Sequence, residues 1–192
     1  MKIGFIGLGI MGTPMALHLA NAGHQLFVHT HSQVPEAIQA AGAVRCDNAA
    51  GVTREAEVVF TMVPDTPDVE AVLFNENGVA HGLKDSAGAV RKVVVDMSSI
   101  SPMATKTFAK KINDLGADYI DAPVSGGEVG AKAASLTIMC GGHAAVFERI
   151  KPLLELMGKN ITLVGGNGDG QTTKVANQII VALNIEAVAE AL

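Results

Sequence analysis

A glycine-rich run near the start of the chain has the residue types and spacing that bind a pyrophosphate. It follows the G-x-G-x-x-G pattern, and its members are Gly7, Leu8, Gly9, Ile10, Met11 and Gly12. In this pattern the first glycine permits a tight turn, the second lets the backbone approach the phosphates, and the third allows a strand and a helix to pack closely. An apolar run precedes it and a helix-period segment follows it, as this mechanism requires. We therefore expect residues 7–12 to bind a dinucleotide; the alternative is an ordinary strand-to-helix turn without a ligand.

A lysine and two amides fall on one face of the last helical segment. Lys174, Asn177 and Gln178 obey the i, i+3, i+4 spacing that places side chains together on a helix. A lysine between apolar neighbours loses hydration, which lowers its pKa and suits it to proton transfer. The helix dipole also disfavours a cation near a helix start, which favours a functional role. The alternative is a solvated lysine in the first turn.

The second strand-like run ends without the acidic residue that commonly binds the adenine ribose of NAD. That acid is expected about 20 residues after the glycines, where the chain has His29, Thr30, His31 and Ser32. We expect His29 and Thr30 to line the cofactor site, and the choice between NAD and NADP stays open. His29 and His31 would share one strand face, but no third ligand is in view, so no metal site is predicted.

Other segments that follow strand-like runs carry residues able to reach a ligand. In open α/β sheets, ligands bind outside the carboxyl ends of the strands. The cofactor contacts predicted on this basis are Met62, Val63, Pro64 and Ser99. Exposed N–H groups of a glycine loop form a carboxylate site, and the loop concerned is Ser125, Gly126 and Gly127. Each segment could instead be a turn or a helix cap.

The elements that must position these residues alternate between strands and helices. Short β-rich apolar runs occur at residues 3–6, 25–29, 57–62, 92–97, 118–121, 135–140 and 161–164, with helix-period segments between them. One such segment has an apolar stripe that ends with Leu153, Leu154 and Met157. This alternation predicts an α/β fold of the Rossmann type, doubly wound around a mostly parallel sheet. We expect residues 1–165 to form this NAD(P)-binding domain.

The segment from about Thr172 to Leu192 is apolar on two helix faces. One stripe is Ala176, Ile179, Ile180, Leu183 and Ala187, and the nearly opposite one is Val181, Ile185, Val188 and Leu192. No Gly, Pro or basic last turn marks an end. We expect residues 166–192 to begin an interdomain helix that would lead into an all-helical domain absent from this sequence. One stripe should rest on the Rossmann-type domain and the other on a second chain, or the helix end should fray.

The composition excludes other classes of protein. The chain has 192 residues, and 19 Asp and Glu oppose 14 Lys and Arg, so no basic face for nucleic acid is expected. Its apolar residues form short runs that do not reach the length of a membrane span. Cys46 and Cys140 lie far apart and no secretory leader is recognised, so a reducing, cytoplasmic setting is expected.

The motifs together resemble the β-hydroxyacid dehydrogenase family, which includes 3-hydroxyisobutyrate dehydrogenase and 6-phosphogluconate dehydrogenase. In chain order they read G-L-G-I-M-G, M-V-P-D, D-M-S-S, D-A-P-V-S-G-G and G-x-G-x-x-x-K-x-x-N. The resemblance implies that Lys174 is the catalytic acid/base and that Asn177 orients the substrate. It also implies that Ser125, Gly126 and Gly127 hold the substrate carboxylate and that Ser99 lies beside the nicotinamide. The segment 85–91 looks longer than is typical of the family.

The reaction that the resemblance implies is NAD(P)H-dependent reduction of tartronate semialdehyde (2-hydroxy-3-oxopropanoate) to glycerate. Another short β-hydroxyacid, such as 3-hydroxyisobutyrate, is an alternative substrate. An imine reductase is disfavoured because those enzymes usually lack a lysine at the position of Lys174. The other alternative is a fragment that binds the dinucleotide without catalysis. Homo-oligomers through the C-terminal helix or the absent domain are expected.

Overall fold

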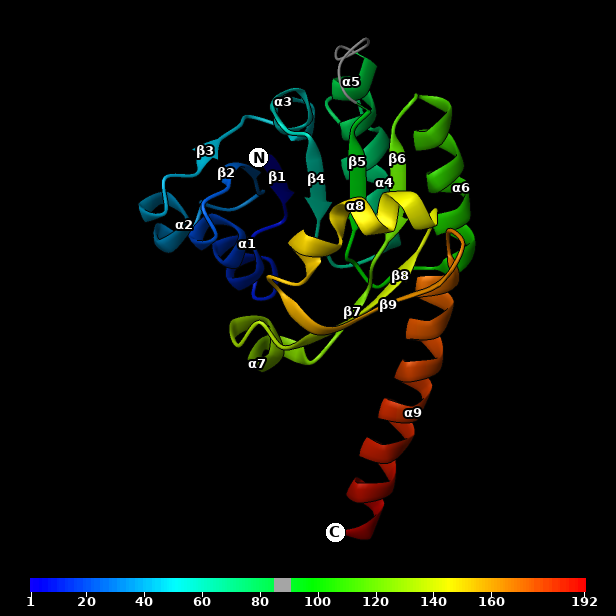
Figure 1. Ribbon diagram of the computed structural model, residues 1–192. Helices are drawn as coiled ribbons and strands as arrows, with labels where there is room; N and C mark the ends of the chain where they lie inside the picture. Colours follow the sequence, from blue (N-terminus) through cyan, green and yellow to red (C-terminus); the bar gives the residue numbers. More distant parts are fainter. Residues whose placement is uncertain (85–90) are drawn as a thin grey trace.

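The computed structural model describes residues 1–84 and 91–192, which form a mostly parallel sheet with helices on both faces (Figure 1). The predicted fold class is confirmed. The strands lie in the order β3-β2-β1-β4-β5-β6-β8-β7, and β9 pairs with β8. Along the chain, the elements are β1 (Lys2–Ile6), α1 (Gly12–Asn21), β2 (Gln25–His29), α2 (Glu36–Ala40), β3 (Val44–Arg45), α3 (Ala49–Glu55), β4 (Val58–Thr61), α4 (Thr66–Phe74), α5 (Val79–Lys84), β5 (Val93–Asp96), α6 (Pro102–Asp114), β6 (Asp118–Asp121), β7 (Val124–Ser125), α7 (Gly127–Lys132), β8 (Leu136–Gly141), α8 (Ala144–Leu154), β9 (Gly158–Gly165) and α9 (Asp169–Ala191).

The chain leaves β1 in one direction and later returns to its other side. β1 pairs in parallel with both β2 and β4. Its first connection leads through α1 to β2, whereas the chain reaches β4 only after passing β3 and α3. The connections therefore diverge between β1 and β4, and such a switch point is where open α/β sheets bind their ligands.

Strand residues alternate between two apolar layers, one on each face of the sheet. Phe5 and Phe60 pack in the layer that also holds the buried faces of α1, α2, α7 and α8. Their rings stack with centroids 6.0 Å apart. Val59 and Val94 point into the other layer, against α3, α4, α5 and α6. Because both faces are covered, the central strands are apolar at consecutive positions, as their sequence indicated.

β8 runs antiparallel to β6 and β7, which leaves the sheet mostly parallel, as predicted. The two-residue strands β3 and β7 were not predicted, because they are too short to give a periodic signal. One helix end differs from the sequence-based expectation. Met157 was predicted in a helical stripe, but α8 ends at Leu154. The Met157 N–H bonds back to the Leu154 carbonyl, three residues earlier, so the last turn tightens and the α-helix stops.

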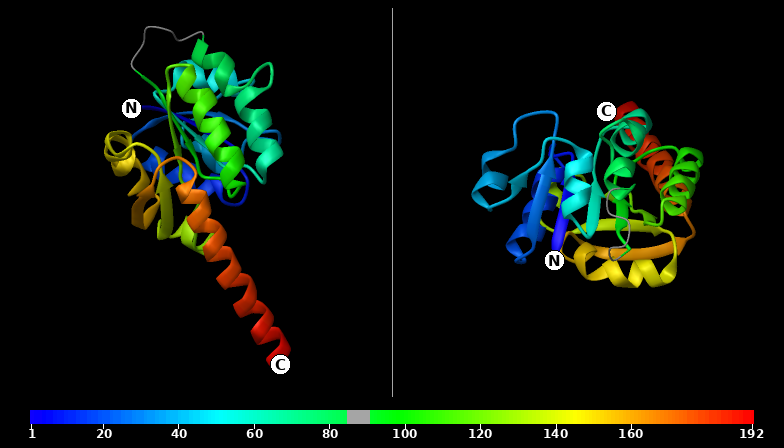
Figure 2. Two further views of the ribbon diagram at one scale, coloured as in Figure 1. Left: turned by 90° about the vertical axis from the view of Figure 1, so that its right-hand side faces the viewer. Right: turned by 90° about the horizontal axis from the view of Figure 1, so that it is seen from above.

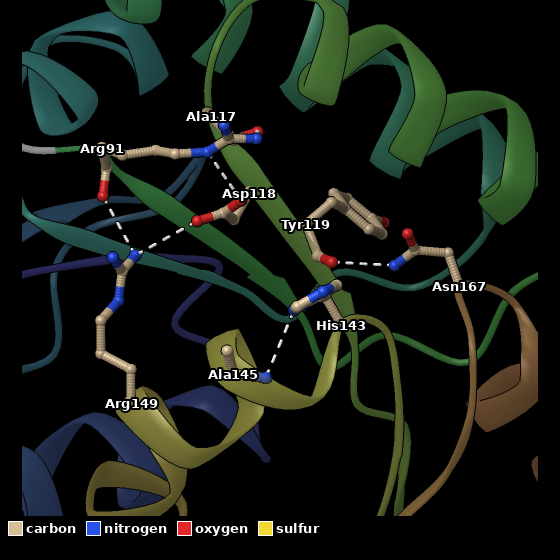
Figure 3. Close-up of polar contacts among 8 residues, drawn as sticks. All are labelled: Arg91, Ala117, Asp118, Tyr119, His143, Ala145, Arg149 and Asn167. Atoms are coloured by element: carbon tan, nitrogen blue, oxygen red, sulfur yellow. Dashed lines mark hydrogen bonds and ion pairs between the residues drawn. The ribbon is translucent and has the colours of Figure 1, made fainter.

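A cluster of polar contacts fastens α8 to the amino ends of the central strands (Figure 3). The Asp118 carboxylate, at the start of β6, pairs with Arg91 at 2.7 Å and with Arg149 of α8 at 3.5 Å. Arg149 also donates to the Arg91 carbonyl. In the same view, Asn167 Nδ2 donates to the Tyr119 carbonyl at 2.8 Å, which ties the turn before α9 to β6.

Helix α9 projects away from the body of the molecule, and its C-terminal turns lie outside the two packed layers (Figure 2). It begins at Asp169, three residues before the predicted start, and continues to Ala191. Both apolar stripes are exposed in this chain, with Ile180 at 60% and Ile185 at 65%. The expectation that one stripe rests on the Rossmann-type domain is therefore wrong, because only the first turns of α9 are buried. The helix is regular to Ala191, so the frayed alternative is not observed either.

The unusually long segment was predicted at 85–91, and residues 85–90 of it lie outside the described part of the chain. In the described part, no helix combines the length and apolar character needed to cross a membrane.

Candidate active site

A cavity of about 680 Å³ lies at the switch point of the sheet. Every predicted cofactor-binding residue lines it: the glycine run 7–12, His29 and Thr30 after β2, residues 62–64 after β4, and Ser99 after β5. A backbone hydrogen bond joins two parts of its wall, since the Gly7 N–H donates to the His29 carbonyl at 3.0 Å. Residues predicted separately, from the ends of four strands (β1, β2, β4 and β5), thus surround one space.

The three glycines have the conformations and surroundings that phosphate binding needs. Gly7 has φ +96, a value that favours glycine, and a Cβ at Gly12 would overlap the Gly7 carbonyl oxygen. By contrast, a Cβ at Gly9 would meet nothing within 4 Å. The backbone of Gly9 is therefore open to the cavity, directly before the N-terminus of α1. Helix N-termini favour anions, so this loop fits a pyrophosphate.

Part of the cavity wall was missed by the sequence reasoning. Its far side comes from the start of α3, from α4, and from the turn between α4 and α5, through Asn48, Ala49, Ala71, Val72, Asn75, Glu76, Asn77 and Gly78. The run Asn-Glu-Asn-Gly is rich in turn-forming residues, so the sequence predicts a loop there. Nothing in the run indicates that this loop lines the cofactor cavity. Glu76 places a carboxylate on this wall.

The end of β2 presents neutral groups to the same cavity. His29, Thr30, His31 and Ser32 all line it, and none carries a carboxylate. The His29 Nδ1 atom lies 3.2 Å from the Cys46 carbonyl oxygen, so the ring contacts the residue that follows β3. Within residues 1–84 and 91–192, no three His, Cys, Asp or Glu side chains group as metal ligands.

Lys174 lines a second, smaller cavity of about 390 Å³ together with Ser99 and Gln178. Ser99 belongs to both cavities, so the lysine cavity adjoins the cofactor cavity. The lysine is only 9% exposed. Burial lowers the pKa of its amine. Lys174 is the sixth residue of α9 and so lies in the second turn. The first-turn placement was wrong, and the case for function rests on burial rather than on the helix dipole.

The remaining predicted substrate residues do not line either of these cavities. Ser125 ends β7, and Gly126 and Gly127 begin α7 with φ values of +129 and +58, so glycine suits both positions. Asn177 lies on α9, and its Oδ1 atom is buried without a hydrogen-bond partner in the described part of the chain. An unpaired buried acceptor is costly, so this atom is available for a ligand donor.

Two buried carboxylates anchor the elements that carry the site. Asp121 accepts hydrogen bonds from the N–H groups of Gly168 at 2.8 Å and Gln171 at 3.1 Å, at the start of α9. Burial raises the pKa of Asp121 to about 6. Asp96 accepts from the Thr61 hydroxyl at 2.8 Å and from the Tyr119 hydroxyl at 3.2 Å. Burial likewise raises the pKa of Asp96.

Comparison with known proteins places this geometry in a family. Residues 2–166 match the family described as the NAD binding domain of 6-phosphogluconate dehydrogenase. The 2-hydroxy-3-oxopropionate reductase of Escherichia coli (strain K12) is 64% identical over 192 residues, which are 100% of this chain and 64% of that protein. The chain thus spans less than two thirds of the length of this curated relative.

Solved structures show the same arrangement. A Mycobacterium tuberculosis 3-hydroxyisobutyrate dehydrogenase, described with L-serine, superposes with a TM-score of 0.85 at 34% identity, covering 99% of this chain and 63% of that one. A protein named Psf3, described in complex with NADP+ and 2-OPP, gives a TM-score of 0.86 at 31% identity, covering 98% and 66%.

Proposed function

The chain belongs to the β-hydroxyacid dehydrogenase family, and from this premise we propose that it binds NAD or NADP and serves the reduction of 2-hydroxy-3-oxopropanoate (tartronate semialdehyde) to glycerate. The relative that is 64% identical is named for this substrate. The family match supports a nicotinamide dinucleotide as the cofactor. The fit of the 680 Å³ cavity supports it independently, because the Gly9 backbone is open and the start of α1 adjoins it.

The observation that chiefly supports the proposal is that Ser99 lines both cavities. The cavity lined by the buried Lys174 therefore adjoins the cofactor cavity. NADH or NADPH, when bound, supplies a hydride to the aldehyde carbon. The Lys174 ammonium donates its proton to the aldehyde oxygen as negative charge develops there, and the resulting amine takes a proton from water afterwards. Because burial lowers the pKa of Lys174, its ammonium gives up the proton more readily than a solvated lysine does.

The residues that would contact the rest of the substrate are assigned through the family resemblance. Ser125, Gly126 and Gly127 would hold the substrate carboxylate with a hydroxyl and backbone N–H groups. Asn177 would orient the substrate, and its unpaired Oδ1 atom would accept a hydrogen bond from a substrate hydroxyl. Homo-oligomer formation through α9 remains part of the proposal, supported by the exposed apolar side chains of that helix.

Replacement of Lys174 tests the assignment. In an assay that follows NADH or NADPH oxidation with 2-hydroxy-3-oxopropanoate, Lys174→Ala should lower kcat by roughly 100- to 10,000-fold, the usual contribution of a general acid. Dinucleotide affinity should stay unchanged. Lys159→Ala, which alters an exposed lysine of β9, is the matched control and should keep full activity. Near-normal turnover of Lys174→Ala would mean that the lysine has only a structural role.

The substrate alternatives are separated by parallel assays. Oxidation of 3-hydroxyisobutyrate in preference to reduction of 2-hydroxy-3-oxopropanoate would favour the activity for which the Mycobacterium tuberculosis neighbour is named. Calorimetric titration with NADH and NADPH, run beside these assays, tests the alternative that this chain binds the dinucleotide without catalysis. Tight dinucleotide binding without turnover on either substrate would show that this chain binds the cofactor without catalysis.

A further inference from the structure

Gln171 is a fully buried amide that the proposed reaction does not use. Its side chain is 0% exposed, and it lies on the first turn of α9, three residues before Lys174. Its Nε2 atom donates to the Ser98 carbonyl at 2.7 Å, and its Oε1 atom accepts from the Ile100 N–H at 3.1 Å. The two bonded backbone groups flank Ser99. One side chain therefore fixes the backbone on both sides of the residue shared by the two cavities.

The same residue is tied to the core through its backbone. The Gln171 N–H donates to the buried Asp121 carboxylate, at the end of β6. The segment 98–100 follows β5, the neighbouring strand. Gln171 thus joins three parts of the fold: the helix that carries Lys174, the loop that carries Ser99, and the carboxyl end of the sheet.

Further hydrogen bonds extend this connection to the cofactor cavity. The Ser98 hydroxyl accepts from the Val63 N–H at 3.0 Å, and Val63 is part of the cavity wall. The Ser98 N–H donates to Asp96 at 3.1 Å, and Asp96 also accepts from Thr61 of β4. A continuous set of hydrogen bonds, buried except for the part-buried bond from Val63, therefore runs from α9 through segment 98–100 to the loop after β4.

We propose that Gln171 is a positioning residue that holds the Lys174 helix against the Ser99 loop and thereby sets the place of the proton donor relative to the cofactor cavity. This inference rests on the proposed function for its catalytic consequence, but the placement itself can be measured without turnover. Gln171 touches neither the cofactor cavity nor, in the proposed reaction, the reacting atoms, and it acts through Ser99 and Lys174.

The chemistry of the two partners requires a carboxamide at this position. A carbonyl oxygen needs a donor and an N–H group needs an acceptor, and a neutral amide supplies one of each. An ionised carboxylate offers acceptors only, and an apolar side chain offers neither. Without the amide, the buried groups of Ser98 and Ile100 lose their partners, so the loop is expected to move or admit water. Either change hydrates Lys174, because Gln171 and Ile100 line its cavity.

Gln171→Met, which keeps the length and removes both bonds, is the main test. The first readout is the NMR titration of Lys174 in protein carrying isotope-labelled lysine, with its signal assigned by its absence in Lys174→Ala. We expect the pKa of Lys174 to rise toward the ordinary lysine value in Gln171→Met. The second readout is kinetic: kcat should fall roughly 10- to 100-fold, as for a small misplacement of a catalytic group, while the dinucleotide Kd stays within about twofold of the wild type.

Thr53→Val is the matched control for loss of a buried hydrogen bond. Thr53 is 0% exposed and donates to the Ala49 carbonyl within α3 at 2.8 Å, away from the lysine cavity. It should lower the free energy of unfolding without moving the Lys174 titration or kcat. The proposal is overturned if Gln171→Met leaves both readouts at their wild-type values, or changes them no more than Thr53→Val does.

A second variant covers the case in which Gln171→Met does not fold. Gln171→Asn keeps a neutral amide but is one methylene shorter, so it cannot reach both Ser98 and Ile100 from the same backbone position and adds no charge beside Lys174. It should shift both readouts in the same directions, and unchanged readouts would equally overturn the proposal. If the wild type reduces neither substrate, the proposed function fails, yet the Lys174 titration in these variants still decides the role of Gln171.

Discussion

The buried carboxylate of Asp121 should make the stability of this protein depend on pH in a predictable direction. Asp121 is 0% exposed and accepts hydrogen bonds from two N–H groups at the start of α9. Burial raises its pKa from 3.8 to about 6, the nearby Asp96 raises it further, and the hydrogen bonds from Gly168 and Gln171 oppose the shift. The perturbation that isolates this group is Asp121→Asn, which has the same shape and does not titrate.

The sign follows from the raised pKa. The folded protein holds the Asp121 proton more tightly than the unfolded chain does, so the stability gained from it is fully present below pH 3.8 and is lost as the pH rises through about 6. The difference between the two pKa values corresponds to about 3 kcal/mol. Between pH 4.5 and 7.5 the wild type should therefore lose about 2 kcal/mol relative to Asp121→Asn.

Urea unfolding of both proteins at several pH values between these limits measures the effect. The quantity to follow is the free energy of unfolding of the wild type minus that of Asp121→Asn, because the asparagine variant does not titrate at this position. This difference should fall by about 2 kcal/mol between pH 4.5 and 7.5, and it should become constant above about pH 7, where Asp121 is ionised in both states. A difference that stays the same throughout, or rises with pH, would refute the reasoning.

Three further predictions concern single side chains. Gly9→Val should weaken dinucleotide binding at least about tenfold with little change in unfolding free energy, because its side chain enters the open cavity and meets no protein atom; unchanged affinity in a titration would contradict the phosphate assignment. Thr30→Asp should weaken NADPH binding more than NADH binding, because a carboxylate after β2 repels the 2′-phosphate, and equal effects on both would place the ribose elsewhere. Ser101→Ala should lower the unfolding free energy by about 1 kcal/mol, since the Ser101 hydroxyl accepts from the Ala104 N–H at the start of α6; urea titration showing no loss would contradict this capping role.

The parts of the fold that the sequence could predict are those whose signals are local. The structure confirms a strand before the glycine run and a helix after it. This arrangement could be predicted because the motif depends only on neighbouring residues in the chain. The central strands were recognised because consecutive apolar residues mark a strand covered on both faces. The face shared by Lys174, Asn177 and Gln178 follows from helical spacing alone.

Element ends and the short strands were predicted less well. α9 starts at Asp169 rather than near Thr172 because the Asp121 carboxylate, 47 residues before Gly168, caps its first turn. The two-residue strand β7 exists only because β8 returns beside it in the antiparallel direction. Neither feature has a signal within its own segment.

What the sequence by itself determined is therefore the type of each main element and the residues that share a face, since backbone geometry repeats over a few residues. The tertiary structure alone decided which faces meet. Gln171 reads locally as one more polar residue at a helix start, but its amide bonds to Ser98, 73 residues away, because the sheet brings the ends of β5 and β6 together beneath α9. Burial at that junction also sets the pKa directions of Asp121 and Lys174, since desolvation depends on every element that packs around a group.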